Sequence, residues 1–403
     1  MEKLSHFFES ARIQDLPQSY KVAQFSTPNA TSLEINTVNW IEPREGELVV
    51  KVSSCGLHAS DQIYKHALLP HLKYPLTPGS FCSGEIVQIG QNVKHLKLHH
   101  KVVGVAIHGG GCLAEYAVLN SDHVSEIKRK EGATQQVYSE VFEGSRVEGN
   151  TLSLSLSPTS PDQEKLTCGR ESLFVAELRR FEKEEKELSK DERRRIHDAN
   201  ERLVFASGGV GGEGVTVVIG DGGSARVAIQ VLKHSSTHKD QRVILLTTDT
   251  QDRWTHSFYD IDESNHLKLS HNEIGSALKS IGGIRFAIAV TQPPQEGLEQ
   301  TLEAMRYGSQ LVVLSPHPSE KLQVPLAPLV AKSLSIRGAV WPDRTSLGKV
   351  LEMVHNHTLH VSSNLYKFTP EGINKAWMDL EKGEKFDQPV VVLDQTFQAV
   401  ETH

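Results

Sequence analysis

Glycines with the spacing G-x-G-x-x-A stand where a β-branched run meets an amphipathic stretch. The run Val215–Ile219 leads into Gly220, Gly222 and Ala225. Gly220 permits a tight turn, Gly222 has no Cβ to keep a ligand away, and the small Ala225 lets a helix pack on the strand. Free N–H groups at the helix start would face a phosphate. We therefore predict a pyrophosphate-binding turn that includes Gly223, with a plain strand-turn-helix connection as the alternative.

The strand that follows this helix should recognise the adenosine ribose of a dinucleotide. Its expected span is Arg242–Thr247, with Asp249 just beyond its end. The register puts Thr247 where an acidic residue usually binds the ribose hydroxyls. A hydroxyl at Thr247, with Arg253 nearby, suits a 2′-phosphate, whereas Asp249 favours a free ribose. The expected cofactor is NAD or NADP, and the choice between them stays open.

The elements around this turn follow two different patterns. Residues 1–127 hold short β-branched segments separated by turn residues, which indicates a barrel or sandwich. Residues 214–340 alternate between strands and helices, which favours a parallel sheet wrapped by helices. The expected strands are 47–53, 83–89, 101–106, 113–119, 215–219, 242–247, 286–290, 310–314 and 389–393, and the expected helices are 224–233, 296–306, 346–356 and 370–382.

Two polar segments interrupt these patterns. Residues 128–165 are rich in Ser, Thr, Gly, Pro and charge, which predicts a long loop or linker. Residues 177–203 are helix formers with opposite charges three and four apart, as in Lys183 and Glu187. Apolar residues are too sparse there for a coiled-coil seam, so we expect a solvated single helix. Both segments are either functional insertions or errors of the gene model.

Composition excludes several classes of protein. The net charge of −7 argues against nucleic acid as a partner, because phosphate binding needs a basic face. Four cysteines without a C-x-x-C pair indicate reduced thiols rather than a disulfide framework. No apolar run approaches the roughly 18 residues of a membrane span. We expect a soluble, cytoplasmic protein.

Four segments of the chain have a distinctive order and spacing: GELVVKVSSCGLHASD, PLTPGSFCSGEIVQIGQNV, KVVGVAIHGGGCLAEYAVL and KSLSIRGAVWPDRTSLGKVLEMV. Together they resemble the medium-chain dehydrogenase/reductase superfamily, and the resemblance covers residues 45–126 and 204–394. This superfamily includes zinc alcohol dehydrogenases and zinc-free quinone and enoyl reductases.

The resemblance implies an α/β chain in which a GroES-like β-barrel domain is joined to a Rossmann domain with a doubly wound parallel sheet. The substrate cleft would lie at their junction. The domain boundaries that we expect are 1–168 for the barrel, 169–340 for the Rossmann domain, and 341–403 for the return to the barrel domain. The polar segments would then be insertions, one in each domain.

The resemblance also locates the zinc ligands of related enzymes, and here most are replaced. His58 stands at the first ligand position, Ser80 and Phe81 at the next, and Cys168 fits the last. Two ligands are too few, because a catalytic zinc needs three protein ligands and water. Cys82 could supply a third, but strand alternation should point it away from Phe81. We therefore expect no bound metal.

A zinc-free set of residues remains at this position. The resemblance implies that the Ser60 hydroxyl relays a proton and that the Asp61 carboxylate orients the site. His58 could then donate a hydrogen bond to a carbonyl in place of the metal. The alternatives are that His58 satisfies a backbone group and that Asp61 caps the following helix. Tyr64 is another candidate donor.

These observations predict an oxidoreductase that uses NAD(P)(H) to transfer hydride to or from a small carbonyl, enone or quinone substrate. One alternative is a nucleotide-binding protein without turnover, since Gln388 and Pro389 stand where relatives place an Arg that contacts the cofactor phosphates. Another is a zinc-dependent alcohol dehydrogenase with an atypical site. A homodimer is also possible, through the strand 310–314 or the segment after it.

Overall fold

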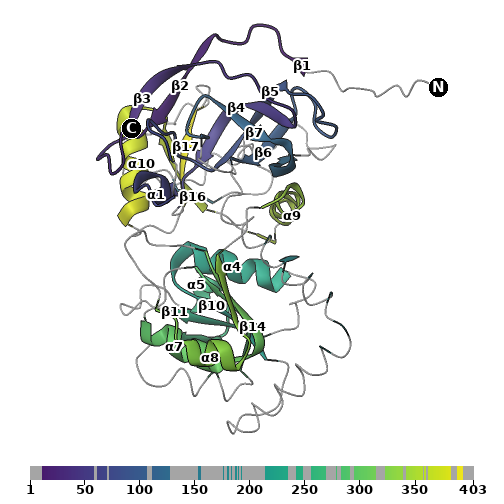
Figure 1. Cartoon of the computed structure of the whole chain (residues 1–403), viewed down its shortest axis with the longest axis vertical. Helices are drawn as coiled ribbons and strands as arrows, with labels where there is room; N and C mark the ends of the chain where they lie inside the picture. Colours follow the sequence, from purple (N-terminus) through teal and green to yellow (C-terminus); the bar gives the residue numbers. More distant parts are fainter. Residues whose placement is uncertain are drawn as a thin grey trace, which may run out of the picture. The chain divides into compact units, whose positions relative to one another are not determined.

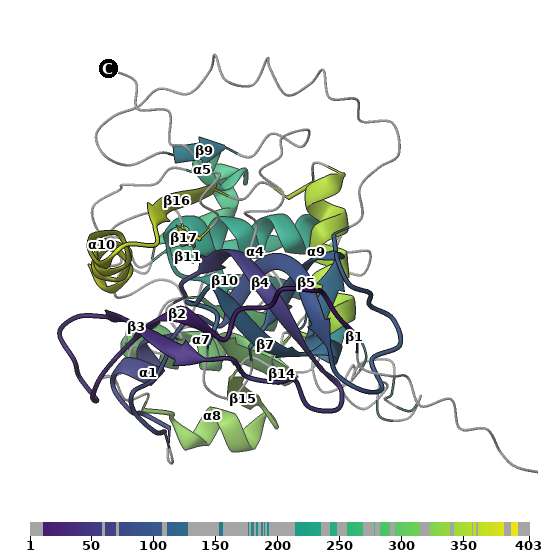
Figure 2. The ribbon, with the colours of Figure 1, turned by 90° about the horizontal axis from the view of Figure 1, so that it is seen from above.

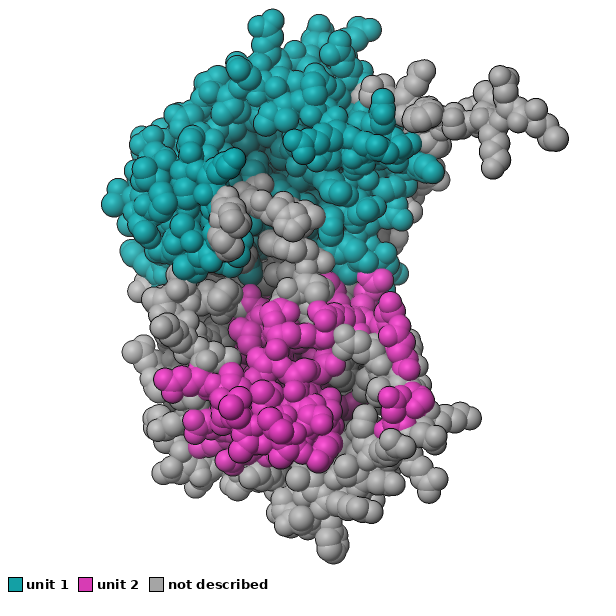
Figure 3. All heavy atoms as spheres, viewed as in Figure 1, with its two compact units in different colours: residues 1–175, 341–403 teal, residues 176–340 magenta. Residues whose placement is uncertain are grey.

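The chain forms two compact units in the computed structural model. Unit 1 comprises residues 1–175 and 341–403, and unit 2 comprises residues 176–340 (Figure 3). Ser60, Cys168, Asp249 and Arg253, considered above, lie outside the described residues. The described residues are 11–58, 61–69, 72–106, 111–127, 153–155, 214–234, 242–247, 256–268, 278, 283–290, 295–314, 323–338, 342–356, 358–359, 362–382 and 388–393, with isolated positions between 176 and 192.

Unit 1 is built on two long neighbouring antiparallel strands, β4 (Glu47–Gly56) and β5 (Phe81–Ile89). Their side chains are buried at almost every position, because the unit packs on both faces of this pair. The described strands around them are β1 (Ala11–Arg12), β6 (Lys101–Val105), β7 (Tyr116–Asn120), β8 (Val124–Glu126), β9 (Ser153–Ser155), β16 (Ser362–Lys367) and β17 (Gln388–Val392), in the order β8-β6-β5-β4-β17-β16-β9, with β1 on β5 and β7 on β4.

The C-terminal segment completes this sheet. Strand β17 pairs antiparallel with β4, so that Val390 faces Gly56. Helix α10 (Pro370–Lys382) packs on β16 and β17 (Figures 1 and 2). The remaining described elements are the hairpin of β2 (Ser19–Gln24) and β3 (Glu34–Asn39), the short helix α1 (Gln62–Lys65), the 3-10 helix η2 (Ser121–His123) and helix α9 (Arg344–His355).

Unit 2 holds a parallel sheet of six strands, whose order is β12-β11-β10-β13-β14-β15. The chain runs outward from β10 to β12, then returns to the other side of β10 and runs outward again. The direction therefore reverses between β10 and β13, which is the switch point where doubly wound sheets bind ligands. The strands are β10 (Val215–Ile219), β11 (Val243–Thr247), β12 (His266–Lys268), β13 (Ile284–Ala289), β14 (Met305–Val313) and β15 (Ser335–Gly338).

Helices cover this sheet. Helix α4 (Gly222–His234) packs on β10, β11 and the short helix α5 (His256–Tyr259), and α7 (Gln295–Ala304) contacts α8 (Leu326–Ala331) (Figure 1). A 3-10 helix, η6 (Glu263–Asn265), leads into β12. The predicted fold class, a barrel-type β domain with a doubly wound α/β domain, is confirmed. Within the described ranges, no helix is long and apolar enough to cross a membrane.

Two predicted element boundaries are wrong for reasons of tertiary structure. The helix expected over 296–306 ends at Ala304, because Met305 already begins β14 and pairs with Ile284. The strand expected over 113–119 begins at Tyr116, because Leu113 and Ala114 instead pair with β2. Both corrections come from strands that are distant in sequence.

The polar segments also differ from expectation where they are described. Residues 153–155 form β9, which pairs with β16, since the alternation of Ser and Leu suits a strand. Lys183 and Glu187 form the expected ion pair at 3.7 Å. The single helix expected over 177–203 is interrupted at Ser189, which is not helical. There Ser189 and Glu192 form a capping box, which marks a new helix start.

Close contact between β4 and β5 generates a prediction about stability. A Cβ added to Gly84 would lie 2.1 Å from the carbonyl oxygen of Lys51 on the facing strand. Gly84→Ala should therefore lower the free energy of unfolding by about 1–3 kcal/mol, since neither backbone can move aside. Thermal denaturation followed by circular dichroism measures this loss.

The matched control is Gly348→Ala in α9, where a Cβ would lie 3.4 Å from the nearest side-chain atom, Ser125 Oγ. It should raise stability by about 0.5–1 kcal/mol, because alanine restricts the unfolded chain. Equal melting temperatures for Gly84→Ala and the wild type would contradict the close approach of the strands.

Candidate functional site

The Gly-rich turn lies between β10 and α4 in unit 2. Gly220 has a φ angle of +132° and Gly222 one of +69°, and L side chains rarely adopt either conformation. A Cβ built on Gly222 would meet no described atom within 4 Å, so the described part of the chain leaves this face of the turn open. Ala225 is buried, and Gly223 lies half-buried in the first turn of α4. These four residues therefore form the turn that their spacing predicts.

A tyrosine that the sequence analysis did not single out contacts this turn. The amide of Gly222 donates a hydrogen bond to the hydroxyl of Tyr259, at 3.1 Å. Tyr259 is the last residue of α5 and is fully buried. The Gly222 N–H therefore points into the protein, although a Cβ at the same residue would point into open space.

Thr247 ends β11 at the carboxyl edge of the parallel sheet, where its side chain is buried. Its hydroxyl lies 3.1 Å from Nε2 of His266, the first residue of β12. The hydroxyl proposed for ribose recognition thus already has a protein partner. Nothing in the local pattern around His266 signals this contact, because it depends on the pairing of β11 with β12.

In unit 1, Asp61 connects two loops. Its Oδ2 accepts the backbone N–H of His58 at 2.8 Å, and its Oδ1 accepts the hydroxyl of Ser80 at 2.9 Å. His58 follows the end of β4, and Ser80 immediately precedes β5. Asp61 stands at the N-cap of α1, but its side chain makes no capping bond. The capping alternative is therefore wrong, because the carboxylate turns toward the two strand ends instead.

Burial determines the acidity of this carboxyl. Asp61 is fully buried, and desolvation raises its pKa to about 6. Hydrogen bonds from the His58 amide, the Ser80 hydroxyl and the amides of Gly79 and Ser80 act in the opposite direction, since they stabilise the charged form. Asp61 is thus a buried acid whose charge depends on pH near neutrality.

The residues at the zinc-ligand positions form an apolar and hydrogen-bonded arrangement. The His58 ring is 8% exposed and meets the ring of Phe81 edge-on, with centroids 6.2 Å apart. Ser80 bonds Asp61, and Phe81 has no donor atom. No three His, Cys, Asp or Glu side chains among the described residues are placed to hold a metal ion. Of the predicted ligand positions that the structure describes, Ser80 is engaged by Asp61 and Phe81 offers no ligand atom.

The comparisons with known proteins agree with both units. The model of the alcohol dehydrogenase GroES-like domain matches residues 44–129. The chloroplastic quinone-oxidoreductase homolog of Spinacia oleracea is 38% identical over 24% of this chain and 32% of its own length. An alcohol dehydrogenase of Geobacillus stearothermophilus is 21% identical over 88% of this chain and 93% of its own length.

A solved structure shares the fold over almost the whole chain. Acetophenone reductase from Geotrichum candidum, in complex with NAD, has a TM-score of 0.60 at 12% identity and covers 94% of this chain and 98% of its own. Residues 44–129 match the GroES-like domain family, and the chain as a whole is similar in sequence and fold to the medium-chain dehydrogenase/reductase superfamily. Unit 1 is its GroES-like domain and unit 2 its Rossmann-like domain. The matches to two quinone-oxidoreductase homologs span only about a third of their length, 32% and 33%.

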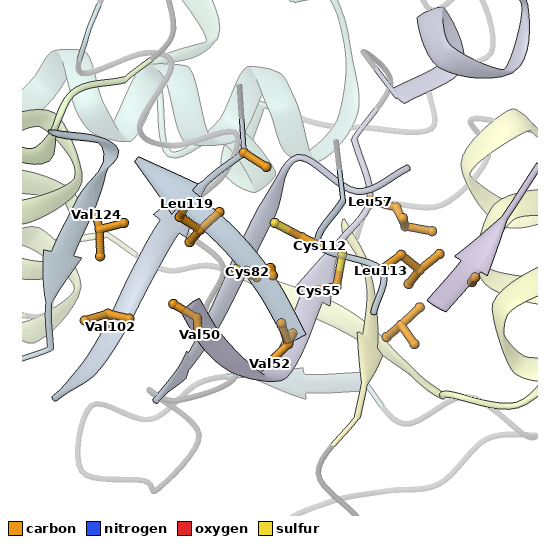
Figure 4. Close-up of a cluster of buried hydrophobic side chains, with 14 of the residues drawn as sticks. Val50, Val52, Cys55, Leu57, Cys82, Val102, Cys112, Leu113, Leu119 and Val124 are labelled. Carbon is orange, nitrogen blue, oxygen red and sulfur yellow. The ribbon is translucent and has the colours of Figure 1, made fainter. Parts of the chain in front are cut away.

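Three thiols lie in the core of this GroES-like domain. Cys55 on β4 faces Cys82 on β5, and Cys112 lies beside them (Figure 4). Burial raises the pKa of Cys55, and a hydrogen bond with Cys82 together with burial raises that of Cys112. Cys55 and Cys112 therefore stay protonated at neutral pH, and all three side chains serve as small apolar groups in the core. Cys82 packs in this core, whereas Phe81 contacts His58, as strand alternation predicts.

Gln388 stands at the position where this superfamily often has an arginine. It is the first residue of β17. The amide of Leu57 donates a hydrogen bond to the carbonyl of Pro389 at 2.9 Å, so the antiparallel pairing of β4 with β17 continues beyond Gly56 toward His58 and Gln388. Gln388 is 5% exposed, and its Nε2 has no hydrogen-bond partner within the described structure. A buried amide group without a hydrogen-bond partner is energetically costly. Tyr64, the other candidate donor, is buried on α1.

The raised pKa of Asp61 generates a prediction about pH. The folded-state pKa of about 6 lies above the ordinary aspartate pKa of 3.8, so the folded protein binds the proton more tightly than the unfolded chain does. This group's contribution to stability therefore grows as the pH falls through 6. Asp61→Asn removes it, so the wild type should gain about 1 kcal/mol relative to this variant between pH 7 and pH 5.

Urea denaturation of both proteins at several pH values measures the difference. Asp122→Asn, on the exposed helix η2, is the control and should follow the wild type. A difference between wild type and Asp61→Asn that does not change with pH would contradict the raised pKa.

Proposed function

We propose that the chain is an NAD(P)(H)-dependent oxidoreductase that acts on a small carbonyl, enone or quinone. The observation that carries the proposal is the turn at Gly220 and Gly222, whose open face lies at the switch point of the parallel sheet. The names of the relatives support an oxidoreductase, and the NAD of acetophenone reductase supports the class of cofactor.

The residues of unit 2 fit a nicotinamide nucleotide. The open face of Gly222 leaves room for a diphosphate, and the first amides of α4, near Gly223 and Ala225, would stabilise its charge. Thr247, at the end of β11, would lie toward the ribose, and Asp249 would follow it. When bound, the nicotinamide supplies or accepts the hydride.

The residues of unit 1 would stabilise the charge on the substrate oxygen and transfer its proton. In this proposal His58 donates a hydrogen bond to the oxygen on which negative charge develops, and Ser60 relays its proton. Asp61 holds the backbone of His58 through the bond at 2.8 Å, which orients the loop that carries both residues. The Nε2 of Gln388 would supply a second donor from β17.

The side chains at the zinc-ligand positions also favour a zinc-independent reaction. The Ser80 hydroxyl is engaged by Asp61, and Phe81 offers no lone pair, so neither replaces a zinc ligand. Without a metal, an enone or quinone is easier to reduce than a simple carbonyl. It accepts hydride at carbon while a hydrogen-bond donor stabilises the oxygen. We therefore place conjugated substrates ahead of simple alcohols.

The test combines binding with turnover. Purified full-length chain is mixed with NADH or NADPH while nicotinamide fluorescence is followed, and a panel of enones and quinones is then added. We expect binding of one nucleotide and its oxidation by at least one acceptor, with no loss after treatment with a zinc chelator. Binding without oxidation by any acceptor would favour a nucleotide-binding protein without turnover, and activity that requires added zinc would refute the zinc-free reaction.

Gly222 provides the variant for this test. Gly222→Ala places a methyl group on the open face of the turn, so nucleotide affinity should fall at least about tenfold. Gly46→Ala is the matched control, because Gly46 has a φ angle of +77° and an equally open Cβ position. Isothermal titration calorimetry measures both. Equal affinity in the two variants would show that the open face is not the nucleotide site.

We further propose a homodimer in which unit 2 meets its copy. Residues 310–313 of the strand named above lie in β14, which is flanked by β13 and β15, so it is not an edge. The edges of the described sheet are β12 and β15, and helix α8, which precedes β15, exposes Leu326 and Val330 at 68% and 75%. An apolar helix face beside an unpaired edge favours self-association.

The double variant Leu326→Asp with Val330→Asp should convert a dimer into a monomer, because it would bury two charges. Light scattering after size-exclusion chromatography measures the mass. Leu68→Asp is the control, since Leu68 is an exposed leucine of unit 1. A monomeric wild type, or a double variant that remains dimeric, would refute this interface.

A cytoplasmic location remains our proposal for the cell. It is supported by three buried free thiols, which suit a reducing compartment. Two related quinone-oxidoreductase homologs carry chloroplast in their names. Fractionation of cells that express the full chain distinguishes the compartments, and recovery from an organelle would overturn the proposal.

A further inference from the structure

We infer that Tyr259 is a positioning residue for the pyrophosphate turn, which acts through the amide of Gly222. The inference rests on the proposed function, because it concerns the same nucleotide site. It begins from the bond of 3.1 Å between the Gly222 N–H and the Tyr259 hydroxyl. The two residues lie 37 positions apart, so this contact exists only in the folded unit.

The bond holds the turn from its inner side. Tyr259 is fully buried, so its hydroxyl lies behind the turn rather than on the open face where a Cβ of Gly222 would point. The amide of Gly220 donates to Leu246 of β11 at 2.8 Å. The turn is thus fixed at Gly220 by the sheet and at Gly222 by Tyr259. Between these points the peptide orientation is set before a ligand arrives.

Neighbouring residues hold the tyrosine in place. Its ring meets His266 edge-on with centroids 5.5 Å apart, and His266 contacts Thr247. Lys233 of α4 bonds Asp260, the residue after Tyr259. Arg226 of α4 lies over the ring of Phe258, 4.9 Å from its centroid. Helix α5 is therefore tied to α4, and the same tyrosine links the glycine turn to the ribose end of the sheet.

Loss of this hydrogen bond should weaken binding of the diphosphate part of the ligand and not of its adenosine part. Without the hydroxyl, the Gly222 N–H loses its acceptor, and the peptide is free to rotate. A diphosphate bound at the turn must then restore the orientation, which lowers its affinity. An adenosine without phosphates makes no use of this orientation. Tyr259 should therefore affect ADP far more than adenosine.

The experiment uses Tyr259→Phe in the full chain and measures affinity for ADP and for adenosine by isothermal titration calorimetry. We expect the affinity for ADP to fall about fivefold, which corresponds to one hydrogen bond, and that for adenosine to change less than twofold. Tyr366→Phe is the matched control. It also removes a buried tyrosine hydroxyl, which bonds Asp379 in unit 1, and should leave both affinities unchanged.

Each outcome decides the inference. An unchanged affinity for ADP in Tyr259→Phe would overturn it, as would an equal fall for ADP and adenosine, which indicates general loss of structure. Should Tyr259→Phe fail to fold, as judged by circular dichroism, amide hydrogen exchange on the wild type takes its place. Slow exchange at Gly222 without ligand would support the inference, and exchange at the rate of an open amide would overturn it. Failure of the wild type to bind ADP, NADH and NADPH would instead remove the proposed function.

Discussion

Two glycines with positive φ angles follow strand β10 of the parallel sheet, and the geometry of the proposed nucleotide site in unit 2 depends on them. Only glycine adopts both angles without strain, so the chain can turn from β10 into α4 with only two residues between them. The turn lies at the reversal of strand order between β10 and β13. The backbone, rather than a charged side chain, therefore makes this place suitable for a diphosphate.

In unit 1 the corresponding physical constraint is the burial of a carboxylate. Removing Asp61 from water is costly, and four hydrogen-bond donors from two loops offset part of that cost. The same bonds hold the loop after β4 against the loop before β5. Where zinc-dependent relatives require metal ligands, this chain thus has an internal acid that organises the backbone. The C-terminal strand β17 pairs with β4, and Pro389 accepts a hydrogen bond from the amide of Leu57, so segments far apart in the sequence build this part of the domain.

The two arrangements share one physical principle. In each, a buried polar side chain bonds a backbone amide beside the functional group rather than acting on a ligand itself. Tyr259 does so for Gly222, and Asp61 does so for His58. Such bonds are made before a ligand arrives, so less binding free energy is lost in ordering the protein. The three buried thiols add apolar packing to the core of the same unit.

The sequence by itself determined the features that depend on local pattern. The spacing of Gly220, Gly222 and Ala225, the span of β10 and the span of α10 were all predictable, because turn geometry and side-chain periodicity are local. The tertiary structure alone decided which side chains meet. The start of β14 at Met305, the pairing of residues 153–155 and the partners of Asp61 depend on strands far away in the chain. The bond from Gly222 to Tyr259 joins residues 37 positions apart, and no local pattern encodes such a contact, because burial and register arise only when the sheet forms.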